Sequence, residues 1–292
     1  MEFRHATSEE QVLAWLAEQG DSACVIAGGT DVMMQYAQGE LSPSSFVHIG
    51  GIKSLASVDN SVTTRFGTLV THRLLAKEPQ IGHRHPALAE AAATVGGWQT
   101  QSVGTLGGNL CNASPAADTA APLLAADAVV ELTSAQGTRR VPLQDFFVGR
   151  RNVDCRPDEL LTAVEAVPIG QSAGEVYLKV GRRGAMVVAV VGLALRLVFD
   201  DQERVRDARL ALCSVASTPV RAHEAERILA EGGTSKEAIR EAGEALQREV
   251  TPIDDSRATA AYRRLILGGL LERAVECCRS RAATKRGAGR DC

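Results

Sequence analysis

The sequence predicts an α+β protein, and two observations support this prediction. Short apolar runs typical of buried strands are interleaved with helical patterns, but without the strict alternation of a parallel α/β fold. Hydrophobic residues make up 45% and charged residues 23% of the 292 residues, the balance of a globular chain that can bury a core. This length is enough for about two domains.

The first unit of the chain is predicted to contain one helix and short strands. Thr7-Ser8 followed by Glu9-Glu10-Gln11 forms a capping box, which marks the start of a helix, and Gly20 ends that helix. The apolar runs predict strands at residues 23–27, resuming at 32–34 after a Gly-Gly turn, and at residues 45–49.

The second and third units contain more strands and helices. Pro86 at a first helical position and Gly96 beyond the last apolar residue bound one of the helices. In the second unit we expect strands at 63–69, 128–133 and 160–167, and helices at 74–77, 86–95 and 120–126. In the third we expect antiparallel strands at 187–199 and 208–213, then helices near 221–231, 236–248 and 257–281.

Composition excludes several classes of function. The formal net charge is −3 and aromatic residues make up 4%, which argues against a nucleic-acid-binding protein. No apolar run approaches the roughly 18 residues of a membrane span, and the N-terminus carries no export signal. We therefore expect a cytoplasmic protein with neither a membrane span nor a nucleic-acid partner.

The seven cysteines have irregular spacing. They match neither a disulfide framework nor a zinc ribbon nor a plant-type iron–sulfur motif, so we predict no metal site. Cys277 and Cys278 are neighbours on an expected helix and do not face one another, which predicts free thiols. No residue is assigned a catalytic role, and the scattered His72, His83 and His85 are expected to be structural or surface residues.

Two glycine pairs are the features of this sequence that point to a bound ligand. One lies in Ala27-Gly28-Gly29-Thr30-Asp31, directly after an expected buried strand, and the other in Gly104-Thr105-Leu106-Gly107-Gly108-Asn109. Glycine lets a backbone approach a ligand closely, and consecutive amides in such a turn form a concavity that binds anions. The two turns could clasp a pyrophosphate, although each could also be a tight turn that merely requires glycine.

The usual phosphate-binding loops are absent from the sequence. It contains no G-x-x-x-x-G-K-[ST] motif, which excludes a Walker NTPase. The second glycine pair lacks the G-x-G-x-x-G spacing of a Rossmann fingerprint. A dinucleotide would therefore be bound by a different fold.

The ordered set of motifs resembles the FAD-binding medium subunits of the molybdenum-containing hydroxylases, which include xanthine, carbon monoxide, N-heterocycle and purine-alkaloid dehydrogenases. The resemblance spans about residues 1–280. Besides the two glycine motifs, the matching segments are Cys111-Asn112-Ala113, Ser114-Pro115-Ala116-Ala117-Asp118, Asp158-Glu159-Leu160-Leu161, Lys179-x-x-Arg182-Arg183-x-Ala185-Met186 and Thr218-Pro219-Val220-Arg221-Ala222.

This resemblance implies a PCMH-type FAD-binding region followed by a smaller C-terminal α+β domain. The FAD-binding region would comprise two subdomains, at residues 1–55 and 56–172, and the C-terminal domain would cover residues 173–283. Residues 284–292 form a basic, glycine-containing tail that we expect to be disordered.

The resemblance also implies which residues hold the cofactor. They are Ala27, Gly28, Gly29, Thr30, Asp31, Val32, Thr105, Gly107, Gly108, Asn109, Cys111, Asp118, Leu161 and Lys179. The two glycine motifs would hold the pyrophosphate and ribityl chain, Asp118 would hydrogen-bond the cofactor, and Leu161 and Lys179 would line the flavin ring.

Several of these residues have alternative interpretations. Asp118 could instead cap a helix that starts near Thr119. Leu161 could be an ordinary core residue, and Lys179 a solvated surface lysine. Cys111 could lie near the isoalloxazine or be a buried, inert thiol.

The resemblance further implies partners. In such enzymes the substrate is hydroxylated at a molybdopterin centre in a large subunit, and electrons pass through two [2Fe–2S] clusters in a small subunit to the FAD. This chain would then be the electron-transfer subunit of a heterotrimer, or a dimer of heterotrimers, acting on a purine, N-heterocycle or similar small molecule. The alternatives are a self-sufficient FAD-dependent oxidoreductase of related fold and a non-catalytic assembly subunit.

The sequence departs from the family pattern at two places. Gln99-Thr100-Gln101-Ser102 stands where family members commonly have Gln-Ile-Arg-Asn, so a cation is missing before the second glycine motif. Ala185-Met186-Val187 stands where some xanthine dehydrogenases have acidic residues. The final electron acceptor therefore stays open among NAD, oxygen, a quinone and a cytochrome.

Overall fold

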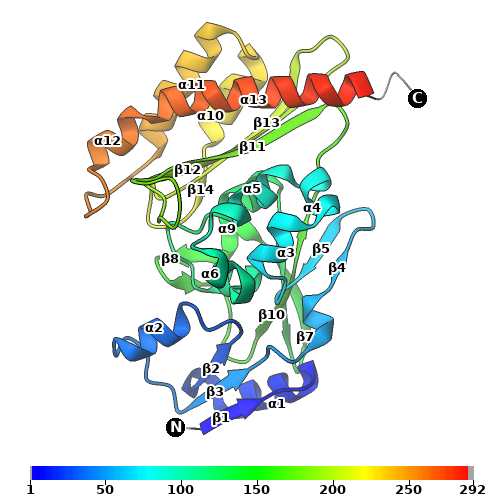
Figure 1. Cartoon of the computed structure of the whole chain (residues 1–292), viewed down its shortest axis with the longest axis vertical. Helices are drawn as coiled ribbons and strands as arrows, with labels where there is room; N and C mark the ends of the chain where they lie inside the picture. Colours follow the sequence, from blue (N-terminus) through cyan, green and yellow to red (C-terminus); the bar gives the residue numbers. More distant parts are fainter. Residues whose placement is uncertain (1, 289–292) are drawn as a thin grey trace.

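The computed structural model describes residues 2–288, in which three larger β-sheets are arranged along one elongated axis and a fourth sheet is a two-stranded hairpin (Figure 1). The N-terminal sheet lies at one end, a five-stranded sheet lies in the middle, and the C-terminal sheet with its long helices lies at the other end. Helices and strands are mixed throughout, which confirms the predicted α+β class.

The N-terminal sheet is parallel and has the strand order β1-β3-β2. Its elements are β1 (Glu2–His5), α1 (Glu9–Gln19), β2 (Ala23–Ile26), α2 (Val32–Ala37) and β3 (Ser45–His48). The expected cap is present, because the Ser8 hydroxyl accepts a hydrogen bond from the Gln11 amide, and Gly20 ends α1. Val12 and Leu16 turn inward from α1 onto the small core beneath this sheet.

The middle sheet is antiparallel and has the order β4-β5-β10-β6-β7. Its strands are β4 (Val58–Asp59), β5 (Thr64–Gly67), β6 (Val129–Ser134), β7 (Gly137–Pro142) and β10 (Leu160–Ala166). Between β5 and β6 the chain forms α3 (His72–Lys77), α4 (Pro79–Arg84), α5 (Pro86–Thr94), α6 (Trp98–Val103), α7 (Leu106–Cys111) and α8 (Ala120–Ala125). The helix α9 (Leu143–Phe146) and a small hairpin of β8 (Phe147–Gly149) and β9 (Asn152–Val153) complete this part.

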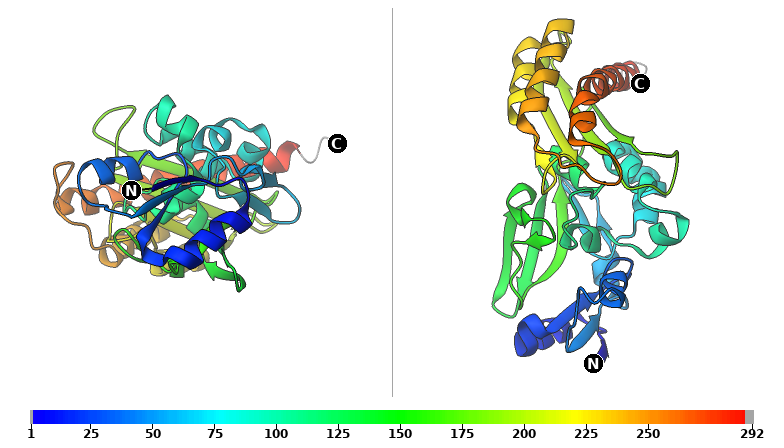
Figure 2. Two further views of the ribbon diagram at one scale, coloured as in Figure 1. Left: turned by 90° about the horizontal axis from the view of Figure 1, so that it is seen from below. Right: turned by 90° about the vertical axis from the view of Figure 1, so that its left-hand side faces the viewer.

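The C-terminal sheet has the order β11-β12-β13-β14 and is also antiparallel. Its elements are β11 (Ala173–Val180), β12 (Val191–Phe199), β13 (Val205–Cys213), β14 (Val220–Arg221), α10 (His223–Gly232), α11 (Lys236–Glu249), α12 (Ala260–Leu265) and α13 (Leu267–Ala288). The helices α10 and α13 pack on this sheet, and α11 packs against both of them (Figure 2).

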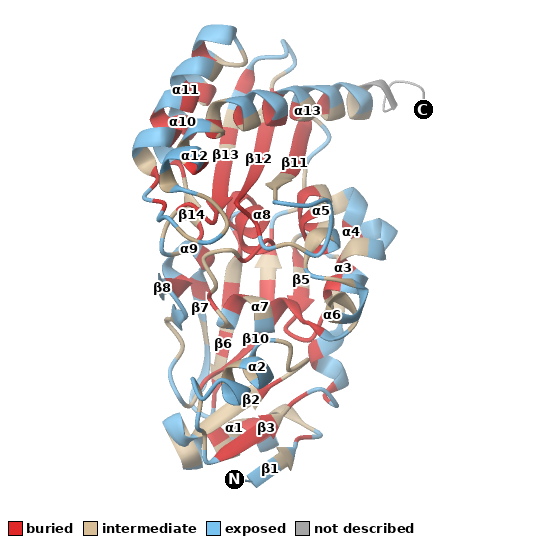
Figure 3. Ribbon diagram, turned by 60° about the vertical axis from the view of Figure 1, so that its left-hand side comes forward, coloured by how far each residue is buried: buried red, intermediate tan, exposed pale blue. Residues whose placement is uncertain are grey.

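The C-terminal sheet is buried on both faces because side chains alternate along its strands. On β11, Val176 faces the core shared with α10, α11 and α13, whereas Tyr177 faces the core of the middle part. On the second face, α5 and α8 contact the sheet. Figure 3 accordingly shows β11, β12 and β13 as largely buried strands.

Two expectations about secondary structure were wrong. Residues 32–34 belong to α2 rather than to a strand, and Met33 and Met34 are exposed on it. The expected long C-terminal helix is divided at Ile266 into α12 and α13.

The C-terminal tail also differs from its expectation. The helix α13 continues through residue 288, so residues 284–288 are helical rather than disordered. Residues 289–292 lie outside the described part of the chain. No helix within residues 2–288 is long and apolar enough to cross a bilayer.

A buried polar cluster joins the C-terminal sheet to the middle part. Glu175 on β11 is 1% exposed and accepts hydrogen bonds from Arg196 on β12. The other oxygen of Glu175 accepts the Ala87 amide at the start of α5, and Arg196 donates to the Val167 carbonyl oxygen. The pair therefore satisfies backbone groups of the middle part as well as each other.

We expect Glu175→Gln to lower the free energy of unfolding by about 3 kcal/mol, because it leaves Arg196 buried without a counter-charge while keeping the side-chain shape. The control is Glu244→Gln, which removes an exposed pair with Arg240 and should cost less than about 1 kcal/mol. Urea unfolding of both variants measures the difference. Equal losses of unfolding free energy in the two variants would show that Glu175 contributes no more to stability than an exposed ion pair does.

Candidate functional site

A cavity of about 390 Å³ lies between the N-terminal sheet and the middle sheet. It is lined by β2, the loop that follows, α2, α7, the start of β10 and the segment before β10. Figure 3 shows α2, α7 and β10 gathered in this region. The volume falls in the range of small-molecule and cofactor sites, roughly 300–1,000 Å³.

Most of the residues predicted to hold a cofactor line this one cavity. They are Ala27, Gly28, Gly29, Thr30, Asp31, Val32, Thr105, Gly107, Gly108, Asn109, Cys111 and Leu161. Residues about eighty positions apart in the chain are thus brought together. Asp118 and Lys179 lie elsewhere.

The two glycine loops are in direct backbone contact. A Cβ at position 28 would lie 1.8 Å from the carbonyl oxygen of Val103, which immediately precedes the second motif. A Cβ at Gly104 would lie 3.6 Å from the Thr30 hydroxyl. Only a residue without a side chain permits the approach at position 28.

The first loop presents unpaired backbone amides. Within residues 2–288, the amides at positions 28–32 donate no hydrogen bond to another residue. Gly29 has a φ of +70°, which lets the chain curl before α2 begins. Successive free amides in such a curl form a concave site for an anion, and the start of α2 adds a favourable dipole.

The second loop differs from the expectation that both turns would donate amides. The amides of Leu106 and Gly107 donate to the carbonyl oxygens of Val70 and Thr68, at 2.8 and 3.0 Å. The Gly108 amide donates to the Thr105 hydroxyl at 3.1 Å, which caps α7. These amides therefore already donate hydrogen bonds within the protein. This loop contributes to the cavity through its side chains and the exposed surface of Gly108.

Gly108 is less closely packed than Gly107. A Cβ there would meet only the Thr105 hydroxyl, at 2.9 Å, whereas a Cβ at Gly107 would lie 1.7 Å from the Thr68 hydroxyl. Gly107 is thus required for internal packing. Gly108 is exposed, so a side chain at this position would extend toward the cavity.

Asp118 and Lys179 form a buried ion pair next to the cavity wall. Lys179 Nζ donates to Asp118 at 2.8 Å and to the Thr94 carbonyl oxygen at 3.0 Å, and the Tyr177 hydroxyl donates to Asp118 at 2.6 Å. Burial raises the pKa of Asp118, and the hydrogen bonds from Lys179 and Tyr177 oppose that rise. Lys179 is therefore not a solvated surface residue, and Asp118 does not cap α8.

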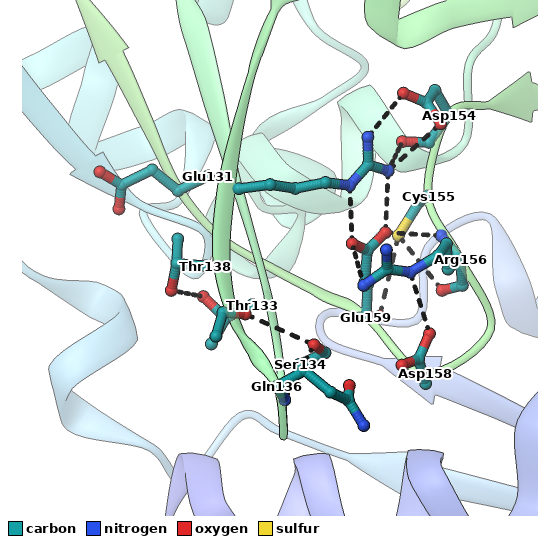
Figure 4. A network of polar contacts seen from close by, with 12 residues as sticks. Glu131, Thr133, Ser134, Gln136, Thr138, Asp154, Cys155, Arg156, Asp158 and Glu159 are labelled. Atoms are coloured by element: carbon teal, nitrogen blue, oxygen red, sulfur yellow. Dashed lines mark hydrogen bonds and ion pairs between the residues drawn. The ribbon is translucent and has the colours of Figure 1, made fainter.

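Ion pairs brace the segment at residues 154–159, which contributes Cys155 and Glu159 to the cavity wall (Figure 4). Arg139 on β7 donates to both Asp154 and Glu159, and Glu159 also accepts the Arg156 amide at 2.7 Å. Burial alone would raise the pKa of Glu159, but the hydrogen bonds from Arg139 and Arg156 outweigh it and lower that pKa. The segment that carries Cys155 is thereby fixed on the wall.

Three thiols line the cavity, at Cys24, Cys111 and Cys155. Cys111 is exposed as a residue, yet burial raises the pKa of its thiol well above the usual value. Burial also raises the pKa of Cys155, to about 12. Cys277 and Cys278 are free, as expected. No group of three or more potential metal ligands occurs in the part of the chain that the structure describes.

Sequence reasoning missed several residues of the wall: Gln35, Thr68, His72, Thr100 and Glu159. His72 is buried, and burial lowers its pKa to about 4, so the imidazole is neutral near pH 7. Thr68 could have been found only from its contact with Gly107, because no motif marks it.

Two family models match successive parts of the chain. Residues 1–169 match the family described as the FAD binding domain in molybdopterin dehydrogenase. Residues 176–278 match the CO dehydrogenase flavoprotein C-terminal domain.

Individual relatives cover nearly the whole chain. Subunit alpha of the 6-hydroxypseudooxynicotine dehydrogenase complex from Paenarthrobacter nicotinovorans is 32% identical, over 92% of this chain and 91% of its own length. A putative xanthine dehydrogenase FAD-binding subunit from Escherichia coli K12 is 32% identical, over 85% of this chain and 86% of its own. A chain of the Cu,Mo-CO dehydrogenase structure superposes with a TM-score of 0.92 at 26% identity, covering 96% of this chain and 98% of that one.

We expect Gly28→Ala to lower the free energy of unfolding by roughly 2–3 kcal/mol, because the added methyl group forces the two loops apart. Gly82→Ala is the control, since a Cβ at Gly82 in α4 meets nothing within 4 Å and alanine favours the helix by about 1 kcal/mol. Thermal and urea unfolding report both effects. A Gly28→Ala protein as stable as the parent would contradict the backbone contact.

Proposed function

Because this chain belongs to the FAD-binding medium subunits of the molybdenum hydroxylases, we propose that the cavity between its N-terminal and middle sheets holds FAD. The observation that carries this proposal is the run of free amides at positions 28–32, set against the second glycine loop. A diphosphate is an anion with many acceptor oxygens, and free amides are the donors that such a group needs.

In this proposal each part of the wall has a separate task. The amides at positions 28–32 bind the diphosphate, the Asn109 side chain donates to phosphate or ribityl oxygens, and Gly108 leaves room for the ligand's approach. Leu161 supplies apolar contact from β10. Bound FAD would supply the redox chemistry, while the protein orients it and excludes water.

We propose that Asp118 and Lys179 act at the edge of this site. Both oxygens of Asp118 already accept hydrogen bonds from Tyr177 and Lys179, but each carboxylate oxygen has a second lone pair that can accept from a ligand. The Thr94 carbonyl oxygen bound by Lys179 adjoins Val95, which lines the cavity. Lys179 thus reaches from the C-terminal sheet to the back of the cavity wall.

The chain is proposed to be an electron-transfer subunit. Its partners would be a large molybdopterin-binding subunit and a small subunit with two [2Fe–2S] clusters, in a heterotrimer or a dimer of heterotrimers. Electrons from a purine, N-heterocycle or similar substrate would reach the FAD and leave to an external acceptor. The free thiols of the described residues fit a reducing compartment, so we propose the cytoplasm as its location.

We expect Gly108→Val to weaken FAD binding at least tenfold while the protein stays folded, because the isopropyl group occupies the ligand's approach. FAD content is read from the flavin absorbance of the purified protein and from titration of the FAD-free protein with FAD. Gly82→Ala serves again as the control and should retain full flavin content. A folded Gly108→Val protein with full flavin content would contradict the assigned position of the ligand.

The purified chain, loaded with FAD, should be reduced by dithionite but not by xanthine or quinoline. The reason is that the proposed substrate site belongs to another subunit. Anaerobic flavin spectra measure both reactions. Reduction by either organic substrate in the absence of partners would favour a self-sufficient flavoenzyme, and a colourless protein that takes up no FAD would favour an assembly subunit.

A further inference from the structure

The side chain of Asn109 is hydrogen-bonded to a residue that does not line the cavity. Asn109 lies on α7 and lines the cavity, and its Oδ1 accepts a hydrogen bond from the Thr119 hydroxyl at 2.7 Å. Thr119 is 0% exposed and does not line the cavity. The two residues belong to neighbouring helices, α7 and α8.

The direction of this hydrogen bond follows from the surroundings of Thr119. Thr119 stands at the N-cap of α8, where a threonine hydroxyl usually accepts from an amide of the first turn. Here it makes no such cap, and it has no other side-chain hydrogen bond within residues 2–288. The buried hydroxyl therefore donates its proton to Asn109 Oδ1, since it would otherwise have no acceptor.

This bond determines which end of the carboxamide is available to a ligand. With Oδ1 engaged by Thr119, the NH₂ group of Asn109 is the end left without a partner in the described chain. An NH₂ group is a donor, like the free amides at positions 28–32 across the loop contact. A reversed carboxamide would instead present its oxygen to the ligand. That oxygen would repel phosphate oxygens, and it could only accept a hydrogen bond from a ribityl hydroxyl.

We propose that Thr119 is a positioning residue for FAD, which acts through Asn109 by fixing its carboxamide with the NH₂ group available to the cofactor. This inference rests on the proposed function, and it assigns a role to a residue that makes no contact with the cavity. The effect requires the hydroxyl proton of Thr119 rather than the bulk of its side chain.

The test is a double-mutant cycle in the full-length chain, with the FAD dissociation constant as the readout. The variants are Thr119→Val, which keeps the shape but removes the hydroxyl, Thr119→Ser, which keeps the hydroxyl, Asn109→Ala, and Thr119→Val combined with Asn109→Ala. Urea unfolding of the FAD-free proteins separates binding from stability. If the valine variant does not fold, Thr119→Ala, which only removes atoms, replaces it in the same cycle.

We expect Thr119→Val to weaken FAD binding about tenfold, the size of one lost hydrogen bond, and Thr119→Ser to stay within about twofold of the parent. In the Asn109→Ala background the valine substitution should change the dissociation constant by less than about twofold, because the group through which it acts is gone. Unchanged binding in Thr119→Val, or the same loss in both backgrounds, would overturn the inference while the parent chain still binds FAD. A parent chain that takes up no FAD would overturn the proposed function, and this inference with it.

Discussion

The contact between the backbone of Gly28 and that of Val103 sets the geometry of the cavity. It brings the loop that follows β2 of the parallel N-terminal sheet against Val103, the last residue of α6, just before the second glycine motif. At Gly28 and Gly107 an added Cβ would lie 1.8 Å from the Val103 carbonyl oxygen and 1.7 Å from the Thr68 hydroxyl, so both positions require glycine for packing within the protein. These glycines are needed first for loop packing, and Gly108 is the position where the absence of a side chain leaves space for a ligand.

The loop contact also explains why the two glycine motifs are not equivalent. The second loop is anchored through its amides to Thr68 and Val70, in the segment that directly follows β5 of the middle sheet. The first loop is anchored by its contact with the second and by α2, and its amides stay free. A fixed wall with side-chain donors and a loop with main-chain donors together suit an elongated ligand that carries a central diphosphate.

The sequence predicted the parts of the site that depend on local chemistry. Glycine pairs, the Ser8 cap and the apolar runs of β2 and β10 are visible in short windows, and twelve of the expected residues meet at one cavity. Amphipathic short helices were harder, because the apolar Val32-Met33-Met34 of α2 resembles a strand until Met33 and Met34 are seen to be exposed. The partners of Asp118 and Thr119 could not be predicted, since they depend on how α8 packs on the C-terminal sheet and on α7.

The C-terminal sheet contributes to the site through buried charges rather than through the cavity wall. Lys179 and Tyr177 both extend from β11 to Asp118, and Glu175 on the same strand binds the first turn of α5. A buried ion pair adds little net stability over an apolar packing of the same volume, but an incorrect alignment leaves charges unpaired and is strongly disfavoured. Such contacts select one alignment of the two parts over others. Asp118 immediately precedes Thr119, so the alignment that pairs Asp118 with Lys179 also sets the position of the hydroxyl that holds Asn109.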